Sequence, residues 1–144
     1  MVNSRNKGAS FERELAKLLF EELGLTFKRD IEQYRAADHG DLICVEMPDF
    51  PFSIEAKRYR AGYGIQPAWW DQCCASALAT LKLPLLVYKY DRLPIRWRFS
   101  VAAVAGMDNY LPAGDIAEQY DWRYAMECDT ITAMMIIREH LADA

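Results

Sequence analysis

Residues 39–59, HGDLICVEMPDFPFSIEAKRY, contain two apolar segments separated by a Pro-Asp pair that is typical of a turn. Side chains alternate between the two faces of a strand, so Glu55 and Lys57 share one face, about 7 Å apart along the chain. Ile54 and Ala56 then face the other way, toward a helix. Buried strands seldom carry charge at alternate positions, so this pattern indicates a role beyond packing.

Asp41 opens the preceding apolar segment. Antiparallel pairing through the short connection at residues 47–51 would bring Asp41 level with Glu55 and Lys57. Two carboxylates that converge beside a cation form a site for a hard divalent ion such as Mg2+. A lysine there can hold or deprotonate a water, or neutralise charge that develops on a phosphate. The alternative is a cross-strand salt bridge on an exposed sheet face.

The rest of the chain predicts an α/β sandwich, in which a mixed central sheet has helices on its faces. Ser10 is the expected cap of the first helix and Gly24 its stop, Pro67 opens the second helix, and Asp129 caps the last. The predicted helices cover residues 10–23, 67–82 and 130–142, and the predicted strands cover residues 25–34, 40–47, 50–59, 83–91 and 96–104.

A length of 144 residues predicts a single domain over 1–144, with its motifs in 3–90 and a C-terminal strand and helix in 96–142. No apolar run approaches the ~20 residues of a membrane span, and the polar N-terminus lacks a signal-peptide core, so we expect a cytoplasmic protein. The four cysteines form no CxxC pair, which favours reduced, buried side chains over a zinc site.

The net charge of −4 is unevenly distributed along the chain. Residues 105–144 contain eight acidic and two basic residues, which leaves residues 1–104 with a net charge of +2. A basic face on an acidic protein can bind phosphate, although solvated loops explain such clusters equally well. The basic residues gather at Arg5 and Lys7; Lys28 and Arg29; Lys57, Arg58 and Arg60; and Arg92, Arg96 and Arg98.

Two polar residues on the predicted helices are further candidates. Glu12 lies within or beside the apolar stripe of the first helix, where a carboxylate costs free energy unless it is paired or binds a metal. The alternative is a boundary residue that reaches solvent or pairs with Arg13 or Lys7. Gln72 lies on a face of small residues and could orient Lys57 or a water, unless it is a surface glutamine.

Aromatic residues surround the same region. Trp69 and Trp70 could stack on unpaired bases. We favour core packing for one of them and coverage of a seam for the other. Tyr59 and Tyr63 border a glycine-containing loop that either grips DNA or only connects two elements.

The pair Gly40–Asp41 followed by Glu55–Ala56–Lys57 resembles the PD-(D/E)xK nuclease motif, with Gly40 in the place of the proline. Asn-Lys-Gly at 6–8, ahead of Glu12, Arg13 and Leu15, resembles the opening of cellular and phage Holliday-junction resolvases of that superfamily. The resemblance covers roughly residues 3–90. It implies a restriction-endonuclease-like three-layer sandwich and a Mg2+-dependent endonuclease that hydrolyses phosphodiester bonds in DNA, with Mn2+ as a substitute.

The resemblance also implies residue roles. Asp41, Glu55 and the backbone carbonyl of Ala56 would be metal ligands, with Glu12 as an additional acidic ligand. Lys57 would assist the attacking water, and Gln72 matches a polar helix position that follows the motif. We further expect Arg5, Lys7, Arg58 and Arg60 to hold flanking phosphates without reading sequence.

The expected substrate is a branched four-way junction, and cutting its two symmetric strands calls for a homodimer. Such an enzyme would act in DNA recombination or repair, in the cytoplasm of a bacterial or phage-infected cell. One alternative is a nuclease of the same fold that acts on other DNA, as restriction and repair enzymes do. Another is a DNA-binding module with a decayed site, although every expected acid and the lysine are present.

Overall fold

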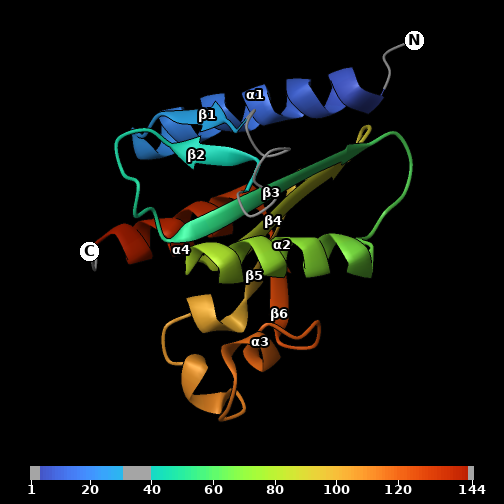
Figure 1. The fold of residues 1–144 in the computed structure, drawn as a ribbon. Coiled ribbons are helices and arrows are strands. Elements are labelled where there is room, and N and C mark those ends of the chain that lie inside the picture. Colours follow the sequence, from blue (N-terminus) through green and yellow to red (C-terminus); the bar gives the residue numbers. More distant parts are fainter. Residues whose placement is uncertain (1–3, 31–39, 143–144) are drawn as a thin grey trace.

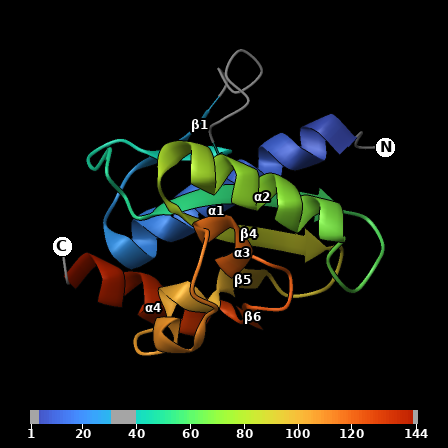
Figure 2. The ribbon, with the colours of Figure 1, turned by 60° about the horizontal axis from the view of Figure 1, so that its bottom comes forward.

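The structure is a computed structural model that describes residues 4–30 and 40–142, with the side chains of α1 described from Lys7 onward. A mixed sheet forms the middle layer, with α1 and α4 on one face and α2 on the other (Figures 1 and 2). This arrangement confirms the predicted α/β sandwich. The helices are α1 (Ser4–Leu23), α2 (Pro67–Thr80), α3 (Ile116–Gln119) and α4 (Thr130–Ala142), and the 3-10 turns are η1 (Val101–Ala103) and η2 (Asp108–Tyr110).

Within residues 4–30 and 40–142, six strands lie in the order β1-β2-β3-β4-β5-β6, which is also their order along the chain. Among these strands, only β3 and β4 pair in parallel, and α2 is the crossover that a parallel pair requires. The other pairs are antiparallel. The strands are β1 (Phe27–Arg29), β2 (Leu42–Cys44), β3 (Phe52–Tyr59), β4 (Leu83–Tyr90), β5 (Arg96–Ser100) and β6 (Ala125–Cys128).

The alternation predicted for β3 is present in the structure. Phe52 and Ile54 belong to the larger apolar core, which includes Leu15 of α1 and Ile137 of α4. Glu55 faces α2 on the opposite side, where Ser76 contacts it. One side of the sheet therefore holds the main core. The other side packs a second apolar cluster against α2 and also presents the charged side chains of β3.

The predicted start of the first helix was wrong. The helix begins at Ser4, so the residues predicted to be a polar arm form its first turns, and Gly8 lies inside the helix. Glycine in a helix costs only about 1 kcal/mol relative to alanine, which packing of the following apolar stripe offsets. The end of α1 is as predicted: Gly24 has φ +72 and donates to the Phe20 carbonyl oxygen at 2.9 Å.

The C-terminal third differs most from the prediction. The strand predicted over 96–104 ends at Ser100, whose hydroxyl accepts from Ala102 N at 3.1 Å and turns the chain into η1. Strand β6 and helix α3 were not predicted. The predicted cap of α4 is confirmed, because Thr132 N donates to Asp129 Oδ1 at 2.9 Å.

The strand predicted over 25–34 is seen only at Phe27–Arg29, and its last residues lie outside the described part of the chain.

All four cysteines are buried and free of disulfides, as expected. Within the described ranges, no helix has the length and apolar character that crossing a membrane requires.

Candidate active site

The β2–β3 pairing places Asp41 beside Glu55, as the sequence predicted. Asp41 N donates to the Ile54 carbonyl oxygen at 2.7 Å, and Asp41 Oδ2 accepts from Ala56 N at 2.7 Å. The carboxylate is thus fixed to the β3 backbone on both sides of Glu55. Gly40 makes this approach possible, because a Cβ there would lie 2.6 Å from the Ile54 carbonyl oxygen.

Glu55 is almost completely enclosed, with 2% of its surface exposed, and Asp41 is 9% exposed. Ser76 Oγ on α2 donates to Glu55 Oε1 at 3.2 Å. Burial, the charge of Asp41 and a hydrogen bond with Asp41 together raise the pKa of Glu55 to about 8. Two buried carboxylates this close repel each other unless a proton or a cation lies with them.

Lys57 follows on the same face of β3. Its Nζ donates to Gln72 Oε1 on α2 at 2.9 Å, so Gln72 contacts the lysine as the sequence suggested. The half-buried lysine and the exposed glutamine meet in the space between β3 and α2. The ammonium group is therefore hydrogen-bonded to α2 and lies within electrostatic range of Glu55.

Glu12 reaches the same region from α1. Burial is the main cause that raises its pKa, and the charge of Asp41 raises it further, which shows that the two carboxylates lie within electrostatic range. The Glu12 carboxylate accepts a hydrogen bond from Arg29 Nε on β1. Glu12 is half-buried, as the boundary alternative expected, and its hydrogen-bond partner is Arg29. The charge of Arg13 also lowers the pKa of Glu12, whereas Lys7 pairs with Asp91.

The predicted phosphate-binding residues divide into different environments. Lys7 and Arg58 both form ion pairs with Asp91, Lys7 at 3.1 Å. Their hydrogen bonds lower the pKa of Asp91, that from Lys7 most strongly. Arg60 is exposed on the loop after β3, and the Arg5 side chain lies outside the described residues. The bases that gather at 92–98 in the sequence also differ: Arg92 is exposed and Arg96 half-buried, whereas Arg98 is buried.

Arg98 is buried, because only 8% of its surface is exposed. Its guanidinium lies 5.1 Å from the Trp70 ring centroid and 4.2 Å from that of Trp122. It also approaches Glu127 at 3.6 Å. This arginine therefore stabilises the packing of the C-terminal segment and is not available to phosphate.

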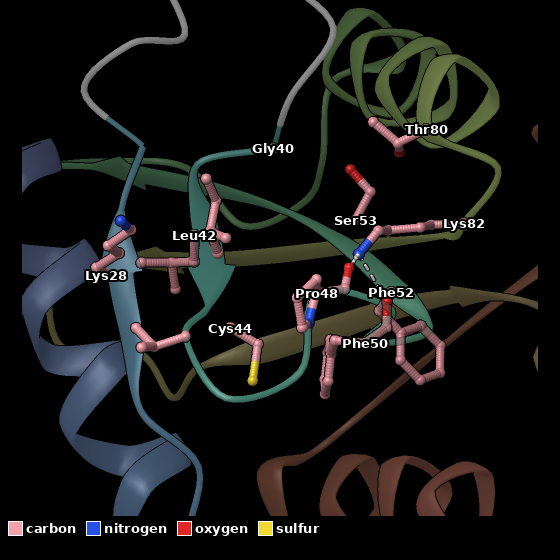
Figure 3. Close-up of a pocket in the computed structure, with 12 residues that line it drawn as sticks. Lys28, Gly40, Leu42, Cys44, Pro48, Phe50, Phe52, Ser53, Thr80 and Lys82 are labelled. Carbon is pink, nitrogen blue, oxygen red and sulfur yellow. Dashed lines mark hydrogen bonds between the residues drawn. The ribbon is translucent and has the colours of Figure 1, made fainter. Parts of the chain in front are cut away.

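A cavity of about 360 Å³ lies between β2, the β2–β3 connection and the end of α2 (Figure 3). Asp41 and Glu55 are not among its lining residues, but Gly40, which precedes Asp41 in the chain, and Ser53 are. Figure 3 shows Ser53 directed toward Thr80, and Ser53 Oγ is buried without a hydrogen-bond partner. Lys82 closes the other end by donating to the carbonyl oxygens of Pro48 and Phe50, both at 2.9 Å.

Three residues of this region were missed from the sequence. Ser76 could have been found, because it lies one helical turn after Gln72 and so faces the same strand. Arg29 was noted only as a member of a basic pair, and Asp91 only as the end of a predicted strand. Their contacts join segments far apart in the chain, which local periodicity does not reveal.

The donor set suits a small hard cation. In the described part of the chain, no group of three or more histidine, cysteine, aspartate or glutamate side chains could hold a metal ion. Mg2+ is commonly bound through one or two carboxylates, with waters and substrate phosphates completing its octahedron. The buried pair Asp41 and Glu55 fits that pattern, since both supply oxygen and their mutual repulsion favours a cation.

These features agree with the comparisons with known proteins. The model of a family described as "Phage putative PDDEXK endonuclease" matches residues 3–108, which is well over half of the chain. The chain therefore belongs to this PD-(D/E)xK endonuclease family, and its mixed sheet flanked by helices is the restriction-endonuclease-like sandwich that the sequence predicted. Nucleases of this kind act on DNA and generally use divalent metal ions.

One solved structure with similarity to the chain is Hjc, a Holliday junction resolvase from the archaeal hyperthermophile Archaeoglobus fulgidus. The identity is 18%, the match covers 65% of this chain and 76% of that chain, and the TM-score is 0.47. At this score the likeness carries no argument about activity. The comparison with curated proteins gives no match.

Proposed function

We propose that this nuclease is a Mg2+-dependent, structure-selective DNA endonuclease that resolves Holliday junctions. The observation that carries the proposal is the position of Asp41 and Glu55, two buried carboxylates in contact, with Lys57 next on the same strand face. Buried carboxylates beside a lysine can bind a metal ion and assist hydrolysis of an anionic phosphodiester. A protein that only binds DNA has no need of buried carboxylates, which repel phosphate.

In this proposal Asp41, Glu55 and the Ala56 carbonyl hold the metal ion, and Mn2+ can replace Mg2+. Glu12 joins them as an additional ligand when it separates from Arg29. A divalent ion at this point supplies charge neutralisation for the phosphate and lowers the pKa of a water.

Lys57 donates hydrogen bonds to the attacking water or to a phosphate oxygen, and Gln72 keeps its ammonium group in place. Ser76 fixes the orientation of the Glu55 carboxylate. Arg5, Lys7, Arg58 and Arg60 contact phosphates that flank the cut, so they position the DNA without selecting a base sequence.

The junction as substrate is supported by the Asn-Lys-Gly and Glu-Arg-x-Leu elements, which both lie on α1 and direct Lys7 and Glu12 toward the sheet. A homodimer would place two such sites on the two symmetric strands of a junction. The enzyme would then act in DNA recombination or repair in the cytoplasm of a bacterial or phage-infected cell. A nuclease of restriction or repair type that acts on other DNA is the second candidate, and the same carboxylate pair supports it.

The test compares a labelled four-way junction with a linear duplex of the same sequence, in Mg2+ and in EDTA. The proteins are the wild type, Asp41→Asn, and Asp49→Asn as a control that removes an exposed charge in the β2–β3 connection. We expect paired nicks in the junction alone, in Mg2+ alone, with wild type and Asp49→Asn. Equal cutting of the linear duplex would leave a nuclease without junction selectivity. Absence of metal-dependent cutting of either DNA would contradict the proposal.

A further inference from the structure

Successive contacts between β3 and α2 continue beyond the catalytic candidates. Glu55 meets Ser76 at 3.2 Å, and Lys57 meets Gln72 at 2.9 Å. The next residue on that face of β3 is Tyr59, which stacks on Trp69 with ring centroids 4.9 Å apart and planes inclined by 7°. An aromatic pair therefore follows directly after the lysine, about 7 Å farther along the strand.

The aromatic pair is rigid and partly open to solvent. Trp69 is 5% exposed, and its ring packs against Tyr88 and Tyr90 as well as Tyr59. Tyr90 also packs against Tyr59, with ring centroids 6.5 Å apart. In contrast to the buried tryptophan, Tyr59 is 40% exposed.

The loop after β3 is held in place by the same cluster. Tyr90 OH donates to the Gly64 carbonyl oxygen at 2.5 Å. Gly62 packs so closely that a Cβ would lie 2.4 Å from the Tyr90 ring, and its φ of +143 also favours glycine. Tyr59 packs against Trp69 and Tyr90 of this cluster, so holding its ring in place on binding costs less conformational entropy than it would for an unsupported side chain.

We propose that Tyr59, supported from below by Trp69, stacks on a nucleobase one or two nucleotides from the phosphate that lies at Lys57. The short spacing of about 7 Å along β3 between Lys57 and Tyr59 keeps that base within one or two nucleotides of the phosphate. Both faces of a base inside a duplex are already covered by its neighbours. The stacking platform, Tyr59 backed by Trp69, therefore selects a base that lacks a stacked neighbour on one face. Such bases occur at a branch point, at a flap or at an unpaired end.

This inference rests on the proposed function in one respect, because that function places the phosphate at Lys57. It adds a residue that determines substrate structure: the aromatic pair recognises the interruption of base stacking, and the basic residues hold the backbone. Base–aromatic stacking tolerates any base, so the selection is for structure and not for sequence.

The test measures binding of a branched DNA that carries 2-aminopurine at successive unpaired positions beside the branch, because stacking quenches its fluorescence. Ca2+ replaces Mg2+, and the DNA is checked afterward for cleavage. The proteins are wild type, Tyr59→Phe, Tyr59→Leu and, as a control, Tyr110→Leu, which removes another exposed tyrosine, in η2. Thermal unfolding of each variant verifies that it is folded.

Wild type, Tyr59→Phe and Tyr110→Leu are expected to quench one or two adjacent positions of the probe. Tyr59→Leu is expected to lose that quenching and to bind the branched DNA about 5-fold or more weakly, with fully paired DNA unaffected. A folded Tyr59→Leu protein that quenches and binds as wild type does would overturn the inference. Equal losses for branched and fully paired DNA would overturn it as well.

The outcomes also separate this inference from the proposed function. If cleavage in Mg2+ is normal but Tyr59→Leu changes nothing, only the stacking platform is refuted. If position-specific quenching depends on Tyr59 but no DNA is cut in Mg2+, the platform stands and the proposed cleavage fails. If wild type binds none of the DNA molecules, both are refuted.

Discussion

The carboxylates of Asp41 and Glu55 lie next to each other in the candidate site. Each carboxylate is held by a neighbour, Asp41 by Ala56 N and Glu55 by Ser76. Burial and the charge of Asp41 raise the pKa of Glu55 to about 8, so we expect a proton on Glu55 to relieve their repulsion when no metal is bound. A divalent cation would displace that proton, so binding of metal and loss of the proton are linked at this site.

We first predict the pH dependence of stability without metal. Glu55 in the folded protein holds a proton up to about pH 8, whereas the unfolded chain releases it near 4.5. The folded state thus binds more protons in this window, and the free energy of unfolding falls as pH rises through it, by up to about 1.4 kcal/mol per pH unit. Urea unfolding in EDTA across this range checks the slope.

Glu55→Gln serves as the comparison for this prediction. The amide cannot ionise, so the slope should be smaller in the variant, and above pH 8 the variant should be more stable than wild type in EDTA. Mg2+ should raise the stability of wild type more than that of the variant. An identical slope for the two proteins would contradict the pKa assigned to Glu55.

The second prediction separates Lys57 from Gln72. Lys57→Met should lower the single-turnover cleavage rate by about 10²- to 10⁴-fold, because the proposed role of the ammonium group is to act on the reacting groups. Gln72→Leu should lower the rate by about 10- to 100-fold, because the lysine remains but loses its support. Rapid-quench cleavage assays in Mg2+ measure both rates, and Lys17→Met on the exposed side of α1 is the matched control. A larger loss for Gln72→Leu than for Lys57→Met would reverse the assigned roles.

At the scale of elements, the sequence predicts well where a local pattern and the tertiary contacts agree. Strand β3 alternates as expected because its two faces meet different layers, and α2 and α4 begin at the predicted residues Pro67 and Thr130. Strand β6 was missed because its four residues carry no apolar alternation and form a strand only by pairing with β5. In α1, tertiary packing extends the helix through a polar turn.

Two glycines give the third prediction, and they should respond in opposite ways to alanine. Gly40→Ala inserts a Cβ 2.6 Å from the backbone of β3 and should destabilise the protein by about 1–3 kcal/mol while separating Asp41 from Glu55. Gly8→Ala, inside α1 with no atom within 4 Å of the added Cβ, should stabilise the protein by up to about 1 kcal/mol. Urea unfolding of both variants checks the signs. Destabilisation by Gly8→Ala would argue that the helix does not begin at Ser4.

At the scale of the whole molecule, part of the acidic C-terminal third lies apart from the N-terminal elements. Figure 1 shows α3, in the acidic C-terminal third, at the opposite end of the molecule from α1 and β2. The position of this acidic segment could not be predicted, because it depends on the buried contacts of Arg98 with Trp70 and Trp122.

The fourth prediction concerns the shared ion pair of Lys7 and Arg58 with Asp91. Lys7→Ala should weaken DNA binding and reduce the slope of log K against log salt by about 1, because one phosphate contact is lost. Asp91→Asn should strengthen binding, because it removes a negative charge that competes with phosphate for both cations. Fluorescence anisotropy of labelled DNA at several salt concentrations measures both. Weaker binding by Asp91→Asn would mean that the carboxylate serves mainly to orient the two cations.

The sequence predicts which charged residues of the site lie together, but it does not predict the contacts that surround them. The order of Asp41, Glu55 and Lys57 and the short connection between their strands were enough to place them together. The contacts of Glu12 with Arg29 and of Lys7 with Asp91 join residues 17 and 84 positions apart, and no local pattern indicates them. Gly40 is another example, because only the close approach of its backbone to β3 leaves no room for a Cβ at this position.

The central claim is that a divalent cation binds between Asp41 and Glu55, and locating Mn2+ in a crystal by anomalous scattering tests it most directly. The crystals should be kept above pH 8, where Glu55 releases its proton, and Asp41→Asn crystals should be treated identically. We predict an anomalous peak within coordination distance of both carboxylates and the Ala56 carbonyl, absent in the variant. Saturating Mn2+ with no peak there, or with its strongest peak elsewhere, would contradict the account.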